Sequence, residues 1–261
     1  MQTLILSVVM ALIIGGGVGW TMKDNNQMSN RAEIGTEYDM RGKGNGGGRQ
    51  EISEVNVEAT DFVSARPEVA SLPMQDLSQA ETAGLMLMRE EEKLARDVYE
   101  TLYDKWGLQI FSNISQSEQT HTEAVRTIIA KYNLEDPVTD DTIGVFVNSD
   151  MQKLYNELTA KGLVSLEEAL VVGATVEDLD IADLQKLIAE TDNDDIKLVY
   201  ENLLRGSRNH LRAFTSQLSS RNSTYTPQYI TQSDFDTITS SAQEKGSKSG
   251  AGGRGWGRKN N

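Results

Sequence analysis

Apolar residues recur every three or four positions from about residue 78 to residue 220, which is the spacing of helices that bury one face. The alternation of apolar and polar residues that is typical of half-buried strands does not occur in this part of the sequence. The spacing therefore predicts an all-α domain with four long helices and one short helix between the second and the third. These helices are expected at Ser78–Gly107, Asn113–Tyr132, Asp150–Lys161 (the short one), Ser165 to beyond Leu187, and Asp192–Leu218.

The expected helix starts carry capping signals. Ser78 is followed three residues later by Glu81, and Ser165 is followed by Glu168, so each pair can form a capping box. Gly107 follows the first apolar stripe and is suited to the left-handed conformation that ends many helices. Long helices joined by short connections favour an up-and-down four-helix bundle.

Polar residues interrupt each of the four long apolar stripes near its middle. On the second helix, for example, Glu118 and His121 stand in the stripe between Ile114 and Val125. Taken singly, such a residue is more often an ordinary hydrogen-bonded core residue than a ligand. Mid-helix positions of a bundle lie at similar heights, however, so these residues are expected to meet in one buried layer. The interrupting residues are Glu92; Glu118 and His121; Glu177 and Asp180; Ser207 and His210.

Composition narrows the chemistry of such a layer. The chain of 261 residues has a net charge of −14, which argues against binding nucleic acid through its phosphates. It has no cysteine, which excludes disulfides and thiolate ligands, and it has only two histidines. Carboxylates with one or two imidazoles suit iron or manganese, and zinc stays open as an alternative. The spacing of the residues alone does not separate these metals.

The segments that flank residues 78–220 differ from it in composition. Residues 1–23 contain an almost uninterrupted apolar or glycine run, which favours a membrane anchor or a cleaved export signal over a buried core helix. Residues 24–77 are expected to form a flexible Gly/Asn-rich linker, and residues 221–261 a mostly disordered tail. The Arg/Gly-rich end is interpreted as a flexible tail in preference to an RNA-binding one. The expected location is a domain outside the cytoplasm, either tethered or exported.

Four motifs resemble those of a known family. Residues 92–99, Glu-Lys-Leu-Ala-Arg-Asp-Val-Tyr, resemble the first-helix E-x-x-A-R-x-x-Y motif of rubrerythrin-type ferritin-like proteins, and residues 118–121 match their second-helix E-x-x-H. Glu177 with Asp180 is similar to the third-helix E-x-x-E, and His210 matches the histidine of the fourth-helix E-x-x-H. Residues 85–214 resemble more closely an uncharacterised ferritin-like family of unknown function. The resemblance implies a ferritin-like antiparallel four-helix bundle. It also implies iron, as a di-iron centre, as the cofactor, with manganese or zinc as the alternatives.

The resemblance also implies roles for individual residues. Glu92 would be a terminal ligand of one metal ion, and Glu118 would bridge two ions with His121 beside it. Glu177 would be the second bridge, and His210 the second imidazole.

Two positions depart from the family pattern, and both concern one metal position. Asp180 is one methylene shorter than the expected Glu, and Ser207 replaces a Glu and cannot act as a carboxylate ligand. Tyr99 is interpreted as a hydrogen-bond donor to the ligands or a redox-active phenol, with an ordinary core tyrosine as the alternative. The neighbouring Glu90 and Glu91 compete with Glu92, which alone fits the motif.

Three functions follow as hypotheses. The first is a metal-dependent oxidoreductase that acts on O2 or peroxide, and its electrons would come from an external donor because the chain lacks the cysteines of a rubredoxin module. The second is a non-enzymatic protein that binds or handles iron. The third is a metal-free helical interaction module. The sequence does not decide whether the protein is an enzyme, or whether it is a monomer or a homodimer.

Overall fold

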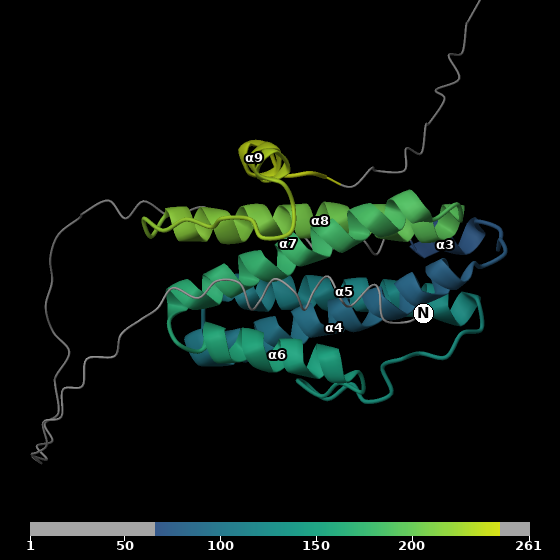
Figure 1. Ribbon diagram of the computed structural model, residues 1–261, viewed down its shortest axis with the longest axis horizontal. Coiled ribbons are helices and arrows are strands. Elements are labelled where there is room, and N and C mark those ends of the chain that lie inside the picture. Colours follow the sequence, from purple (N-terminus) through teal and green to yellow (C-terminus); the bar gives the residue numbers. More distant parts are fainter. Residues whose placement is uncertain (1–65, 246–261) are drawn as a thin grey trace, which may run out of the picture. The chain divides into compact units, whose positions relative to one another are not determined.

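The computed structural model describes residues 66–245, and this part of the chain is all-helical, as the apolar spacing predicts (Figure 1). No strand occurs in the described range. The short helix between the second and third long helices is present as α6. The helices are α3 (Arg66–Ser71), α4 (Gln79–Trp106), α5 (Gln109–Lys131), α6 (Ser149–Gly162), α7 (Leu166–Glu190), α8 (Asp194–Ser219) and α9 (Gln232–Ser240).

The helix ends follow local chemistry. Ser78 and Glu81 form a reciprocal capping box at the start of α4, and Gly107 ends that helix with a φ of 62° in the left-handed region. At α7 half of the expected capping box forms: the Ser165 side chain accepts a hydrogen bond from the Glu168 N–H. Helix α5 begins at Gln109, four residues before the predicted Asn113, and has no side-chain cap.

The long helices pack in antiparallel pairs, α4 with α5 and α7 with α8. In the contacts between α4 and α5, residues later in α4 pair with residues earlier in α5, which is the pattern of antiparallel helices. The pairs are Arg89 with Thr122, Arg96 with Gln119, and Glu100 with Ser115. Helix α4 also contacts α7, and α5 contacts α8, so side chains of all four helices reach a common interior. Helix α6 covers α4 and α7 (Figure 1).

The common interior has an apolar layer on each side of a polar one. One layer is formed around Leu85, Met88, Ile128 and Leu203. The other contains a cluster of tilted aromatic rings, in which the ring centroid of Phe214 lies 5.3 Å from that of Tyr99 and 5.8 Å from that of Phe111. Between these layers, each long helix contributes its interrupting polar residues, which are therefore shielded from water on both sides.

The chain after α8 differs from the predicted disordered tail. Asp178 on α7 is fully buried and accepts hydrogen bonds from the Tyr225 hydroxyl at 2.7 Å and from the N–H groups of Gln228, Tyr229 and Ile230. Farther on, Glu244 pairs with Arg208 and Arg212 of α8. The ordering comes from contacts distant in sequence, which local apolar spacing does not reveal.

The segment before α4 also departs from the predicted linker over residues 66–77. It contains α3, and Lys131 donates to the carbonyl oxygens of Val69 and Leu72. The remaining linker and the N-terminal anchor or signal, like residues 246–261, lie outside the described residues. Within residues 66–245, no helix is both long and apolar enough to cross a membrane.

The carboxylate of Asp178 is expected to hold residues 225–230 on α7. Asp178→Ala would leave the buried Tyr225 hydroxyl and Ile230 N–H without an acceptor, and should destabilise the fold by roughly 2–4 kcal/mol. Urea unfolding measures this loss, and limited proteolysis should show earlier cleavage after residue 220. Asp236→Ala, on the exposed face of α9, is the matched control and should change stability by less than about 0.5 kcal/mol. Equal stability of the two variants would contradict the assignment.

Candidate metal centre

The polar layer brings together ionisable side chains from four helices. Glu92 comes from α4, Glu118 and His121 from α5, Glu177 from α7 and His210 from α8. None of the five is more than 4 % exposed. Each lies on the inward face of its helix because apolar residues three or four positions away face the same core.

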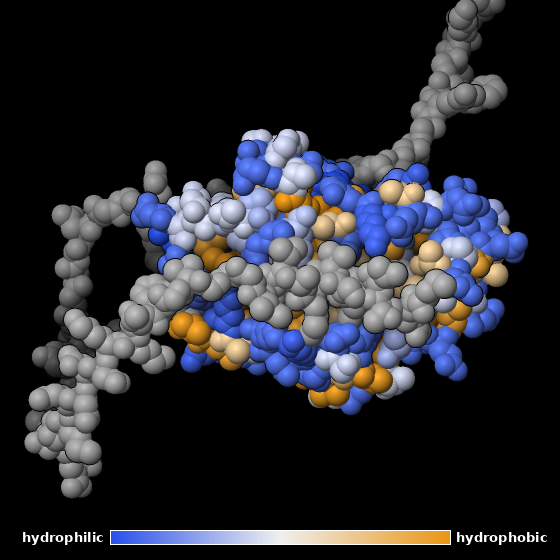
Figure 2. Space-filling view, viewed as in Figure 1, coloured by the Kyte–Doolittle hydropathy of each residue, from blue (hydrophilic) through white to orange (hydrophobic). Residues whose placement is uncertain are grey.

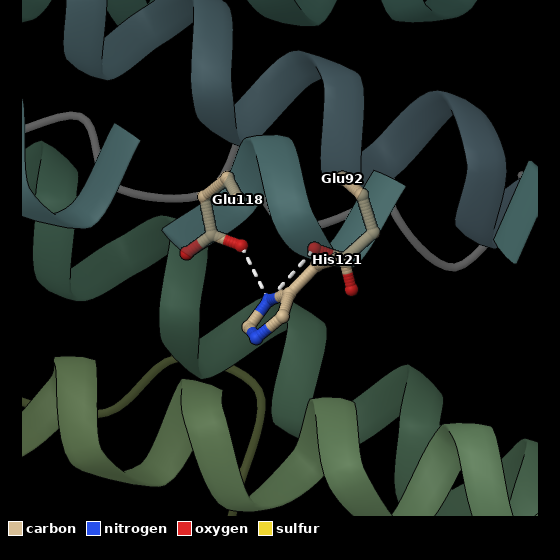
Figure 3. A group of neighbouring side chains, drawn as sticks. All are labelled: Glu92, Glu118 and His121. Carbon is tan, nitrogen blue, oxygen red and sulfur yellow. Dashed lines mark hydrogen bonds and ion pairs between the residues drawn. The ribbon is translucent and has the colours of Figure 1, made fainter. Parts of the chain in front are cut away.

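A first group consists of Glu92, Glu118 and His121 (Figure 3). His121 Nδ1 lies 2.7 Å from Glu118 Oε2 and 3.3 Å from Glu92 Oε2. Glu118 and His121 meet because three residues on a helix span about one turn, and Glu92 approaches from the neighbouring α4. Figure 3 shows both carboxylates directed at the same imidazole nitrogen.

A second group consists of Glu118, Glu177 and His210. His210 Nδ1 lies 2.7 Å from Glu118 Oε1 and 3.4 Å from Glu177 Oε2. Glu118 therefore belongs to both groups, with one oxygen beside each imidazole. The two imidazole rings face each other at a centroid distance of 5.7 Å.

Several buried polar atoms of these groups have no hydrogen-bond partner. They are Glu92 Oε1, Glu118 Oε1 and His210 Nδ1. His210 Nδ1 and Glu118 Oε1 lie 2.7 Å apart, and neither atom has a hydrogen bond to another group. Unpartnered buried atoms are costly, and a cation bound between them would satisfy both at once. The donor set of carboxylates and imidazoles without sulfur thus fits a metal ion such as iron, manganese or zinc.

The charged groups in the layer shift one another's pKa values strongly. Burial alone would raise the pKa of Glu118, but the two imidazoles beside it lower that pKa. Conversely, burial opposes the charged form of His210, yet Glu118 and Glu177 raise its pKa to about 9, and Glu118 and Glu92 raise that of His121. Without metal the imidazoles therefore hold protons at neutral pH, and a bound cation would take their place.

Asp180 lies at the margin of the layer. Its carboxylate accepts a hydrogen bond from the Ser207 hydroxyl, and it belongs to neither group of potential ligands. The two departures from the ferritin-like pattern therefore contact each other. Burial and the charge of Glu177 raise the pKa of Asp180 to about 8.

Tyr99 lies between the polar layer and the cluster of aromatic rings, and it contacts both. Its hydroxyl donates to Glu177 Oε1, and the Gly173 carbonyl oxygen lies 3.3 Å away. The phenol is fully buried, and burial together with the charges of Glu177 and Glu118 raises its pKa. Tyr99 is thus a neutral donor that positions the Glu177 carboxylate.

The structure separates the three consecutive glutamates of α4. Glu92 alone faces His121, Glu90 accepts a hydrogen bond from Asn148 at 3.3 Å, and Glu91 belongs to neither group of potential ligands. Two contributing residues escaped the sequence reasoning. Ser117 lies 3.1 Å from His210 Nε2, and Gly206 leaves room for His121, because an added Cβ would lie 2.5 Å from its ring. The sequence signal for Ser117 is its place directly before the E-x-x-H motif, and Gly206 has no such signal.

A small pocket reaches the layer from the side of α4, α6 and α7. Its polar wall is formed by Glu91, Glu118, Glu177 and Asp180. The rest of the wall is aliphatic, with Leu94, Ala95, Leu154, Val176 and Leu179. The pocket therefore places carboxylates of the centre beside an aliphatic wall.

Comparison with known proteins assigns the chain to a family. Residues 81–242 match the model of the family described as "Uncharacterized protein domain (DUF2202)", and the chain belongs to this family. It is 58 % identical over 178 residues to "Uncharacterized protein MJ0754" of Methanocaldococcus jannaschii, an alignment that covers 68 % of this chain and 96 % of that protein. The crystal structure of hypothetical protein MJ0754 matches with a TM-score of 0.66 and 59 % identity over 67 % of this chain and 99 % of the other. The matched family description carries no activity.

The pKa shifts predict how the metal-free protein responds to pH. His210 and Asp180 have folded pKa values of about 9 and about 8, above their ordinary values of 6.5 and 3.8. At neutral pH both groups hold protons in the folded state that the unfolded chain releases. The free energy of unfolding therefore falls as the pH rises through the pKa values of the folded state. Between pH ~6 and pH ~9, the free energy of unfolding of chelator-treated protein should fall by roughly 2–4 kcal/mol. Asp180→Asn should reduce this fall, and a flat or rising profile in urea unfolding would contradict the shifts.

Proposed function

We propose that this protein binds redox-active metal, iron in the first place, at the buried layer of a ferritin-like four-helix bundle. The observation that carries the proposal is the position of Glu118. Its Oε2 lies 2.7 Å from His121 Nδ1 and its Oε1 lies 2.7 Å from His210 Nδ1, so one carboxylate serves two three-residue groups. A carboxylate shared between two imidazoles is the arrangement in which one ligand bridges two metal positions.

The two metal positions would differ in their remaining ligands. Glu92 and His121 would complete the first, and Glu177 and His210 the second. Asp180 is held by Ser207 and would stay outside the inner ligand set. The oxygen and nitrogen donors favour iron, and manganese and zinc are the other outcomes of a metal analysis.

A second candidate function is an oxidoreductase that reduces O2 or peroxide. The pocket favours it, because the space beside Glu118 and Glu177 is small and has aliphatic walls, which suits a molecule of the size of O2 or peroxide. When bound, iron would supply the change of oxidation state that the reduction of O2 or peroxide requires. Tyr99 would keep Glu177 oriented throughout, and the electrons would come from an external donor, since the chain has no cysteine for an iron–sulfur module.

Two simpler functions are distinguished by experiment. Peroxide turnover by the iron-loaded protein with a reductant separates the oxidoreductase from a protein that only binds or handles iron. Metal analysis of protein purified without chelator or affinity metal separates both from a metal-free helical interaction module.

The central layer is tested by removing its ligands. Wild type loaded anaerobically with Fe²⁺ should gain about 2.7 kcal/mol of stability at a hundredfold excess over Kd, measured as a rise in Tm. His121→Ala and Glu118→Gln should lose most of the bound iron and of this gain, because each removes a donor from the centre.

Glu90→Gln is the matched control. Its carboxylate is buried on α4, the helix that carries Glu92, but contacts Asn148, outside the layer. It should keep the iron content of wild type. Full iron content in both His121→Ala and Glu118→Gln would refute the metal-binding function.

A further inference from the structure

Apolar side chains are exposed at both ends of α6. In the part of the chain that the structure describes, six large apolar side chains are exposed, and five of them lie within six residues of this helix. These five are Ile143, Val145 and Val147 before the helix, and Leu163 and Val164 after it. Figure 2 shows apolar surface, in orange, near each end of α6, with hydrophilic surface between. Apolar surface gathered in this way marks an interaction site.

Between these two ends, the outward face of α6 is charged. The inward residues, Met151 and Leu154 among them, are buried where α6 packs on α4 and α7. The charged residues that are exposed recur at steps of three and four, so they form one outward stripe. In chain order they are Asp150, Lys153, Glu157 and Lys161. The sign of the charge therefore alternates along the stripe, from negative at the start of the helix to positive at its end.

This alternation makes the stripe complementary to itself in the reverse direction. If a second copy lay antiparallel across α6, with the two-fold axis beside residues 155–156, Asp150 would meet the partner's Lys161, and Lys153 would meet the partner's Glu157. The axis would repeat each pair, as in any two-fold interface. A parallel arrangement would place like charges against each other at all four positions, which is unfavourable.

The apolar ends fit the same register. Val147 and Val164 are 69 % and 73 % exposed, and they lie just outside the two ends of the helix. Around the same axis, Val147 would cover the partner's Leu163 and the partner's Val164, and the contact would occur at both ends. Removing these side chains from water favours association.

We propose that this protein forms a two-fold dimer in which the exposed face of α6 packs antiparallel on α6 of a second copy. The 14 residues of α6 give a face about 21 Å long, which is near the small end of specific interfaces. The dimer is therefore expected to form reversibly and to depend on protein concentration. The proposal is independent of metal binding, because no residue of the stripe belongs to the polar layer.

Charge reversal tests the interface. Sedimentation velocity of the full chain should show a shift from monomer to dimer as the protein concentration rises. Lys153→Glu places two acids opposite each other at two symmetric places, and should raise the Kd of the dimer at least about tenfold. The double variant Lys153→Glu/Glu157→Lys restores opposite charges across the axis and within the helix, and should return the Kd to within about threefold of wild type. Lys186→Glu, an exposed position on α7, makes the same change of charge and is the matched control.

The orientation is tested by cross-linking, which is clean because the chain has no cysteine of its own. Asn156→Cys, beside the axis, should form a disulfide-linked dimer on mild oxidation, whereas Ser149→Cys, at the helix end, should stay monomeric. Equal cross-linking of the two variants would overturn the antiparallel arrangement. A chain that stays monomeric at every concentration, or a dimer that Lys153→Glu leaves as stable as wild type, would overturn the proposal as a whole.

Discussion

Burying carboxylates in a helical core costs several kcal/mol for each charge unless an opposite charge or a cation compensates it. The middle of this protein contains Glu92, Glu118, Glu177 and Asp180, with His121 and His210 as the imidazoles among them. Glu118 is the group on which the compensation depends, because both imidazoles lie against it. Protons on the imidazoles supply the compensation in the absence of metal, and a metal ion would supply more of it. The apolar layers on both sides of this level keep water from doing so.

The same constraint explains the architecture around the layer. Four long helices are needed to bring side chains to one level from four directions, and the capping of α4 and α7 fixes where along each helix that level falls. Small residues then make room. Gly206 lets α8 approach the His121 ring, and Gly173 leaves space for Phe214, which closes the aromatic side. The interior is therefore shaped for polar groups that a core selected for stability alone would replace by leucine.

Most of the fold was predictable from apolar spacing, because each long helix buries a continuous stripe of its own residues. The spacing also located the polar layer, since Glu118 and His121 interrupt such a stripe at helical intervals. Residues whose partners are distant in sequence could not be found in this way. Asp178 lies one position from Glu177, yet its partners begin at Tyr225, and α9 lies in a segment without a long apolar period.

The position of a bound ion is the most direct evidence on whether the polar layer is a metal centre. Crystals of the protein grown with Mn²⁺ would locate each ion by its anomalous scattering. We expect density inside the polar layer, with Glu118 oxygens and the Nδ1 atoms of His121 or His210 at about 2.0–2.3 Å from it. Ions found only at exposed acids, with Glu118 still lying directly against both imidazoles, would contradict the claim that this layer is a metal centre.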